Sequence, residues 1–372
     1  VSKNMEHYGY NGRGELIAAT NTAPIARYVY TFDDIGNRIV ADELGTNIAY
    51  TANALNQYTN IVAEAPFVPE FDDDGNQTLV KTSTGIWHVT YNAENRPVLW
   101  SNGTAVVTMD FDRMGRRVWY KSISGAQTNA FSKFVYDSYL CVQQLDGTTG
   151  NVEQEFVWDP TETVATRPLT WSLPAPNRTF FYFHDGNKNV SDLIDADSAT
   201  LATHYDYAPF GAVTSATGPF AAVNPYRFSS EWHDDQLGCV YYNYRHYNQM
   251  NGRWQNRDPI GNFGFLSSQQ KLVSSSVRNF SKAYFWLIQK ERRLPDEILN
   301  SYHYCRNQTV NSLDDLGLGS EWYRHGHCCN KSSGDEWALV AQGEECGKWK
   351  KLAPGECVGS YWSDEDCEGM TC

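Results

Sequence analysis

The sequence predicts an all-β protein built from antiparallel hairpins, and three observations lead to this prediction. Aromatic residues make up 14% of the 372-residue chain, only 20% of the residues are charged, and 28 are glycine. Aromatic side chains suit pleated sheet surfaces, and glycine suits the tight turns between strands. Stretches such as Tyr28–Asp33 and Val106–Asp112 also alternate apolar and polar residues, which places every second side chain on the same face of a strand.

A short motif recurs through the first half of the chain. Each copy holds an aromatic residue, Asp or Asn, two variable residues, and then Gly or Asn. The Asp or Asn side chain can bond to its own backbone in a turn, and Gly supplies a positive φ. Spacings of about 20 residues fit one hairpin with its turns, and hairpins of this kind bury their apolar faces only against neighbours, so we expect one curling sheet. The copies are Tyr10–Gly14, Phe32–Arg38, the weaker Ala52–Tyr58, Phe71–Gln77, Tyr91–Val98 and Phe111–Val118.

These motifs resemble the YD repeats of RHS-repeat proteins, a family whose related shells occur in bacterial toxin complex C subunits and in teneurins. The resemblance implies that the hairpins form part of a hollow β cocoon around a cargo. The chain has fewer repeats than a complete shell is expected to need, and it begins at Val1 close to a repeat. We therefore expect a fragment or processed product of a longer protein.

The stretch Asn224–Gly261 carries the most specific pattern in the chain. It is similar over nearly its whole length to the RHS-associated core segment, from Pro-Tyr-Arg-Phe to Arg-Asp-Pro. Arg227, Arg245 and Arg253 stand among aromatic residues and carboxylates, which suits buried cation–π and bidentate contacts. We interpret these three arginines as structural contacts inside the shell.

In this family the core ends in a motif at which the chain cuts itself. The resemblance implies an aspartic-protease-like pair formed by Asp258 and Asp314, with Arg257 as an electrostatic partner. The bond to be cut would join Leu318 to Gly319. Two carboxylates held close together share a proton, so that one activates water while the other polarises the carbonyl. The residues expected to support this site are Tyr244, Arg245, Tyr247, Arg253 and Trp254.

Two features differ from the family pattern. Asp315 stands where proline is usual, which changes the turn and adds a carboxylate beside Asp314. Residues 262–299 form an insertion, and within it Val277–Leu294 can be drawn as a helix with one apolar face. The insertion is either a tolerated loop or a regulatory or membrane-surface helix.

The last residues, Gly319–Cys372, differ in composition and hold six of the nine cysteines. Crowded cysteines indicate a disulfide framework in an oxidising compartment, and an unstructured remnant is the alternative. A zinc site built from His325, His327, Cys328 and Cys329 is the weaker alternative, because no second ligand pair follows at zinc spacing. We predict no cofactor.

The net charge of -14 repels phosphate backbones, so nucleic-acid binding through the shell is disfavoured. No apolar run is long enough to span a membrane. The sequence and the resemblance together predict a secreted or cell-surface protein. Its expected partners are its own C-terminal domain as cargo and either secretion machinery or a cell-surface target.

We therefore expect three regions: a YD-repeat strip at 1–135, an RHS-associated core domain at 136–318, and a variable cysteine-rich domain at 319–372. The predicted function is encapsulation of a C-terminal toxin or effector and its release by cleavage after Leu318, in interbacterial competition or host interaction. Two alternatives stay open. The first is a non-enzymatic adhesion or carbohydrate-contacting surface protein, and the second is a degraded RHS copy.

Overall fold

The computed structural model describes residues 7–22, 25–161, 167–259, 301–307 and 309. Beyond these it describes the backbone of short strands at 312–313, 321–322, 327–329, 336–339, 349–352 and 357–359. The chain divides into two compact units, Val1–Glu321 and Trp322–Cys372. The predicted helix at 277–294 and the remainder of the insertion lie outside the described residues. So do the predicted disulfide pairs of the tail.

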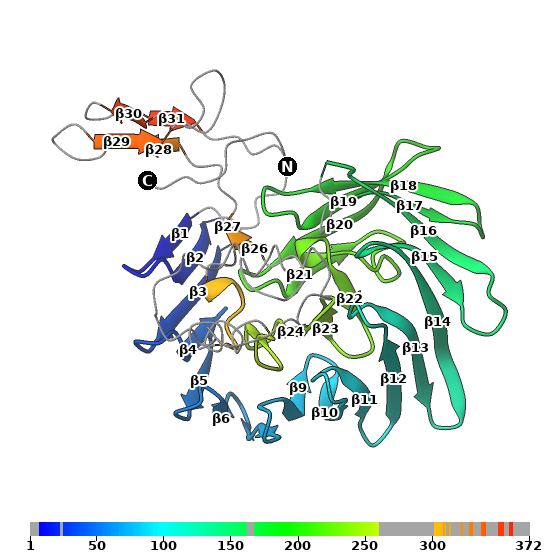
Figure 1. The fold of residues 1–372 in the computed structure, drawn as a ribbon, viewed down its shortest axis with the longest axis horizontal. Coiled ribbons are helices and arrows are strands. Elements are labelled where there is room, and N and C mark those ends of the chain that lie inside the picture. The colour runs from blue at the N-terminus through cyan, green and yellow to red at the C-terminus, as the bar shows by residue number, and fades with distance from the viewer. Residues whose placement is uncertain are drawn as a thin grey trace, which may run out of the picture. The chain divides into compact units, whose positions relative to one another are not determined.

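The first unit begins with a seven-stranded sheet whose strands follow chain order, with antiparallel pairing between neighbours (Figure 1). Its strands are β1 (His7–Tyr10), β2 (Leu16–Thr22), β3 (Ile25–Phe32), β4 (Arg38–Glu43), β5 (Thr46–Ala52), β6 (Tyr58–Val62) and β7 (Pro66–Phe67).

A fourteen-stranded antiparallel sheet comes next, and its strands again follow chain order. Its strands are β8 (Glu70–Phe71), β9 (Gln77–Thr82), β10 (Gly85–Tyr91), β11 (Pro97–Ser101), β12 (Ala105–Phe111), β13 (Arg117–Ser124), β14 (Gln127–Asp137), β15 (Leu140–Asp146), β16 (Val152–Trp158), β17 (Pro168–Leu173), β18 (Arg178–His184), β19 (Val190–Asp195), β20 (Leu201–Tyr207) and β21 (Val213–Thr217).

The predicted continuous sheet is thus divided in two between β7 and β8. Pro66 and Pro69 flank this point. Proline has no backbone N–H to donate to a neighbouring strand, so the ladder of hydrogen bonds stops there. The prediction of an all-β antiparallel fold is otherwise confirmed, and in the described residues the sheets do not close on themselves.

The repeated motif forms the turn that it predicts. In the second copy, the Asp33 N–H donates to the Asn37 carbonyl at 2.8 Å, and the Gly36 N–H donates to the Asp33 carbonyl at 3.1 Å. Asp33 Oδ1 also accepts hydrogen bonds from the N–H groups of Ile35 (3.1 Å) and Asn37 (2.7 Å). The register shifts by a β-bulge beside the motif aromatic, at Thr31/Phe32 in this copy. Such bulges increase the local twist and so bend the strip.

One face of both sheets is packed with aromatic side chains. In β10 the residues alternate, so that Trp87 and Val89 are buried while Ile86 is exposed. The two ends of the strip approach each other, because Phe210, which follows β20, packs against Tyr30 of β3 with ring centroids 4.8 Å apart. The strip therefore curls, as predicted.

A core segment, defined as residues 224–259 and 301–309, lies on the buried face of the strip. It contains a small sheet of β22 (Trp232–Asp234), β23 (Cys239–Tyr241), β24 (His246–Asn248) and β25 (Arg253–Trp254), and two 3₁₀ turns, η1 (Phe228–Ser230) and η3 (Cys305–Asn307). The Arg117 N–H of β13 donates to the Tyr241 hydroxyl at 2.8 Å. Arg117 also forms a buried ion pair with Asp234 at 3.2 Å. Contacts of this kind hold the segment against the strip.

Short strands follow the core segment. They are β26 (Ser312–Leu313), β27 (Glu321–Trp322), β28 (His327–Cys329), β29 (Glu336–Leu339), β30 (Trp349–Leu352) and β31 (Cys357–Gly359), with β28 pairing with β31 and β29 with β30. Among the residues that the structure describes, no helix has the length and apolar character that crossing a membrane requires.

Candidate self-cleavage site

Asp258 follows β25 in the core segment, at the point where the two described parts of that segment meet. Its N–H donates to the Ser301 carbonyl at 3.1 Å, which joins residue 258 to the returning chain. Asp258 Oδ2 lies 3.0 Å from Nη2 of Arg245, and the Asp258 side chain is 17% exposed whereas that of Arg245 is 1% exposed. The carboxylate thus keeps access to solvent while a buried guanidinium fixes its position.

Arg245 is itself held by two further contacts. Its guanidinium carbon lies 4.1 Å from the centroid of the Trp254 ring, and its Nη1 lies within weak hydrogen-bond reach of the Ser301 carbonyl at 3.4 Å. The backbone N–H of Trp254 donates to the Tyr302 carbonyl at 3.1 Å. A planar guanidinium can stack on an aromatic ring and pair with a carboxylate at once, which makes arginine suited to this position.

Arg257, the predicted electrostatic partner of Asp258, lies against the turn between β8 and β9. A Cβ atom added to Gly75 in that turn would come within 2.6 Å of Arg257 Nε. Asp258 forms an ion pair with Arg245. The sequence predicts Arg245 as a supporting residue of the site. Its pairing with Asp258 follows from the pairing of Tyr247 with Trp254 between β24 and β25, which residue spacing does not indicate.

The other predicted wall residues connect the core segment to the strip. The Tyr244 hydroxyl lies 2.7 Å from that of Tyr139. The Tyr247 hydroxyl donates to the Phe210 carbonyl at 2.9 Å. Arg253 stacks on Tyr58 at 3.8 Å, and burial lowers the pKa of its guanidinium. The predicted cation–π and bidentate contacts of the three core arginines are thus present, with Arg227 pairing with both carboxylate oxygens of Asp235 at 2.7 and 2.9 Å.

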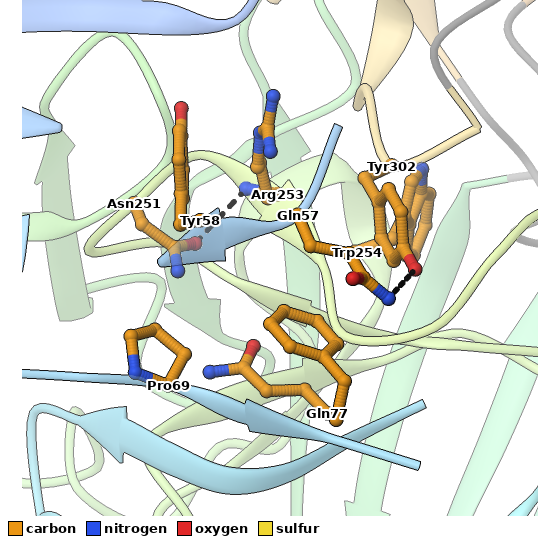
Figure 2. Close-up of a pocket in the computed structure, with 9 residues that line it drawn as sticks. Gln57, Tyr58, Pro69, Gln77, Asn251, Arg253, Trp254 and Tyr302 are labelled. Carbon is orange, nitrogen blue, oxygen red and sulfur yellow. Dashed lines mark hydrogen bonds between the residues drawn. The ribbon is translucent and has the colours of Figure 1, made fainter. Parts of the chain in front are cut away.

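A small pocket adjoins this wall at the division between the two sheets, and Figure 2 shows its lining. Two hydrogen bonds join polar groups within the lining: Gln57 Nε2 donates to the Tyr302 hydroxyl at 3.2 Å, and the Arg253 backbone N–H donates to Asn251 Oδ1 at 3.2 Å (Figure 2). We therefore interpret the pocket as a packing junction between the two sheets and the core segment. Its lining residues are Gln57, Tyr58, Pro69, Phe71, Gln77, Asn251, Arg253, Trp254 and Tyr302.

The remaining predicted site residues are not placed. Asp314, Leu318, Gly319 and His325 lie outside the described residues. Of the other zinc candidates, His327, Cys328 and Cys329, only the backbone of β28 is described. The structure accordingly brings together Asp258, Arg245 and Trp254, and the pairing of Asp258 with Asp314 stays a prediction.

The hairpin strip and the core segment on its inner face are the architecture of a YD-repeat shell. The family model of the teneurin YD-shell matches residues 1–275, so the chain belongs to this family. The predicted relationship to RHS and teneurin shells is confirmed.

The chain is also similar to one curated protein and to solved structures of toxin proteins. The chain is 22% identical over 301 residues to double-stranded DNA deaminase toxin A of Burkholderia cenocepacia (strain H111), covering 68% of this chain and 20% of that protein. It is similar to the crystal structure of TcdB2-TccC3, with a TM-score of 0.44, 14% identity, and coverage of 84% of this chain and 18% of that one. For the Tc holotoxin pore of Photorhabdus luminescens the TM-score is 0.42 with 13% identity, covering 84% of this chain and 18% of that one. The chain thus spans about a fifth of the length of these relatives.

Proposed function

We propose that this chain is part of a YD-repeat shell that encloses a toxin or effector carried at its own C-terminus, and that it frees this cargo by cutting itself after Leu318. The observation that carries the proposal is the placement of Asp258, a partly exposed carboxylate tied to a buried arginine at the end of the core segment. Membership of the YD-shell family and the likeness to a deaminase toxin support it.

In the proposed reaction, Asp258 and Asp314 act on the peptide bond between Leu318 and Gly319. One carboxylate takes a proton from water as the water oxygen attacks the Leu318 carbonyl carbon, while the other, protonated, donates its proton to the carbonyl oxygen. The first carboxylic acid then passes the proton that it took from water to the Gly319 nitrogen as the C–N bond breaks, and a hydroxyl of the intermediate returns its proton to the second carboxylate as the carbonyl re-forms. Because the bond belongs to the same chain, its effective concentration is very high and a modest catalyst suffices for one turnover.

The test is expression of the chain followed by mass spectrometry for a fragment that begins at Gly319. We expect Asp258→Asn to abolish that fragment, since an amide cannot exchange the proton. Asp235→Asn is the matched control, because Asp235 also pairs with a buried core arginine, Arg227, but at a different place in the core segment. Equal cleavage in Asp258→Asn and wild type would reject the assignment.

The buried aromatic face favours the shell over the adhesion alternative. Tyr30 is 1% exposed, and Trp87 and Trp100 are fully buried. A surface that binds carbohydrate by stacking needs such rings in contact with solvent. The proposal also places the protein outside the producing cell or at its surface, in interbacterial competition or host interaction, with its own C-terminal domain as first partner and secretion machinery or a cell-surface target as the second.

A further inference from the structure

Seven turns of the strip share a feature that the repeat motif does not reveal by itself. In such a turn the carbonyls of the first and fifth residues accept the turn's own backbone hydrogen bonds, as those of Asp33 and Asn37 do. The fourth residue adopts a positive φ, which turns its carbonyl away from those bonds. These fourth residues, with their φ angles, are Gly36 (82°), Asn56 (63°), Gly75 (87°), Asn95 (59°), Gly115 (84°), Lys188 (59°) and Gly211 (86°).

Each of these seven carbonyls accepts a hydrogen bond from a side chain of the core segment. We call them the turn-carbonyl row. A buried carbonyl needs a donor, and the core segment supplies one to each of these seven turns. In order along the strip, the donors are Asn307 to Gly36 (2.9 Å), Arg253 to Asn56 (2.7 Å), Tyr302 to Gly75 (2.8 Å), Asn256 to Asn95 (3.0 Å), Tyr241 to Gly115 (3.5 Å), Ser230 to Lys188 (2.6 Å) and Gln249 to Gly211.

The last part of the core segment, residues 301–309, connects the two ends of the strip. We call it the exit strap. Two of its side chains donate to the row near the chain start, at Gly36 and Gly75. At the other end, Asn187 Nδ2 donates to the Thr309 carbonyl at 2.6 Å, in the turn between β18 and β19. The strap thus leads the chain across the strip from the Asp258–Ser301 hydrogen bond toward the predicted cleavage motif.

We propose that hydrogen bonds to the turn-carbonyl row fix the position of the exit strap on the strip. We further propose that Tyr302 and Asn307 are positioning residues, which set where the cleavage motif emerges relative to Asp258. The second half of this inference rests on the proposed self-cleavage. The first half concerns only how the strap binds. Cleavage then depends on repeats from both ends of the strip being folded, because both ends hold the strap.

The cleanest test removes one donor and keeps its ring. Tyr302→Phe deletes the hydroxyl that bonds to Gly75 but leaves the ring beside Phe71. The matched control is Tyr207→Phe, which deletes an equally buried hydroxyl bonded to the Val190 carbonyl at 2.7 Å within the strip. Tyr302→Phe also removes the acceptor of the Gln57 hydrogen bond, which joins the strap to the strip as well. Loss of one such bond corresponds to about a two- to tenfold change in an opening equilibrium, so two- to tenfold is the smallest change expected for Tyr302→Phe.

Hydrogen exchange followed by mass spectrometry measures how often the backbone amides of the strap open to solvent. We expect exchange in a peptide spanning 301–307 to rise at least about two- to tenfold in Tyr302→Phe and to stay at the wild-type level in Tyr207→Phe. The yield of the Gly319 fragment is expected to fall only in Tyr302→Phe. Equal exchange of this peptide in the two variants would overturn the registration of the strap.

A pair of glycine variants tests the turn side of the same contact. Gly36 and Gly45 flank β4 and have φ angles of 82° and 88°. A Cβ on Gly36 would come within 2.3 Å of the His303 ring, whereas a Cβ on Gly45 would meet nothing within 4 Å. Both Ala variants carry a similar backbone strain, so only Gly36→Ala is expected to raise exchange in the strap. Equal strap exchange in both would also overturn the inference.

The two proposals fail in different ways. If wild type is never cut and the exchange differences appear, the proposed function fails while the strap registration stands. If wild type is cut and Tyr302→Phe loosens the strap without lowering the fragment yield, self-cleavage stands and the positioning role of Tyr302 is rejected.

Discussion

His246 lies in β24 of the core segment, buried between the rings of Trp100 and Tyr241 at centroid distances of 5.6 and 5.3 Å. Burial, and to a smaller extent the nearby charge of Arg117, lowers the pKa of its imidazole to about 3. Burial also lowers the pKa values of His184 and His233 to about 4. These three side chains are therefore neutral in the folded protein throughout the mildly acidic range.

Acidification is expected to destabilise the fold through these histidines. In the unfolded chain a histidine has a pKa of about 6.5, so below that pH the unfolded state binds protons that folded His246 does not. Stability is thus lost as pH falls from about 6.5 toward 3, and at pH 5 the loss from one such residue is about 2 kcal/mol. Urea unfolding at pH 7 and pH 5 measures it.

His246→Leu is expected to shrink the difference between the two pH values by about this amount. His88→Leu, at an exposed position of β10, serves as the control and is expected to leave the difference unchanged. An unaltered pH dependence in His246→Leu would mean that the folded protein accommodates a charged imidazole there.

At the scale of the element, the motif turn is stabilised by its first side chain. Asp33 accepts two backbone hydrogen bonds and a third from Asn37 Nδ2 at 2.7 Å. The next residue, Asp34, has a fully exposed side chain that lies 3.8 Å from Arg13. Asp33→Ala is expected to lower the free energy of unfolding by about 1–2 kcal/mol, as loss of a capping side chain does, and Asp34→Ala is expected to leave it unchanged, because an exposed ion pair contributes little. Denaturant midpoints of the two variants provide the comparison, and equal midpoints would contradict the capping role.

The elements were predictable from sequence because their signals are local. The aromatic alternation and the Asp-to-Gly spacing of a copy such as Phe32–Arg38 contain a strand end, a turn and a bulge within seven residues. The division of the strip at Pro66 and Pro69 was also present in the sequence, although the repeats gave no reason to weigh it. The pairing of Asp258 with Arg245 was not predictable, because it depends on the small sheet of the core segment and on Ser301 returning beside it.

At the scale of the whole molecule, the chain leaves and re-enters the core at one hydrogen bond, from the Asp258 N–H to the Ser301 carbonyl at 3.1 Å. Residues 260–300 lie between these points in sequence. Replacing them with a linker of about five Gly and Ser residues is expected to leave the fold intact and to raise the free energy of unfolding by about 2 kcal/mol, since each halving of loop length gains about 0.6 kcal/mol.

Thermal unfolding of this variant, alongside wild type, measures the effect. A lower midpoint would show that residues 260–300 contribute stabilising contacts and are more than a tolerated loop. The yield of the Gly319 fragment is compared between this variant and wild type. A higher yield in the variant would show that the longer connection of wild type hinders cutting after Leu318.

The turn-carbonyl row has a consequence for how such a shell can vary. The groups that recognise the core segment belong to the main chain, and main-chain atoms are the same in every residue type. The repeats can therefore change most of their side chains without altering what the core segment binds, provided that each turn keeps its left-handed residue. The specificity of the contact therefore depends almost wholly on the donor side chains of the core segment. Sequence changes in the strip and sequence changes in the core segment are expected to be uncoupled.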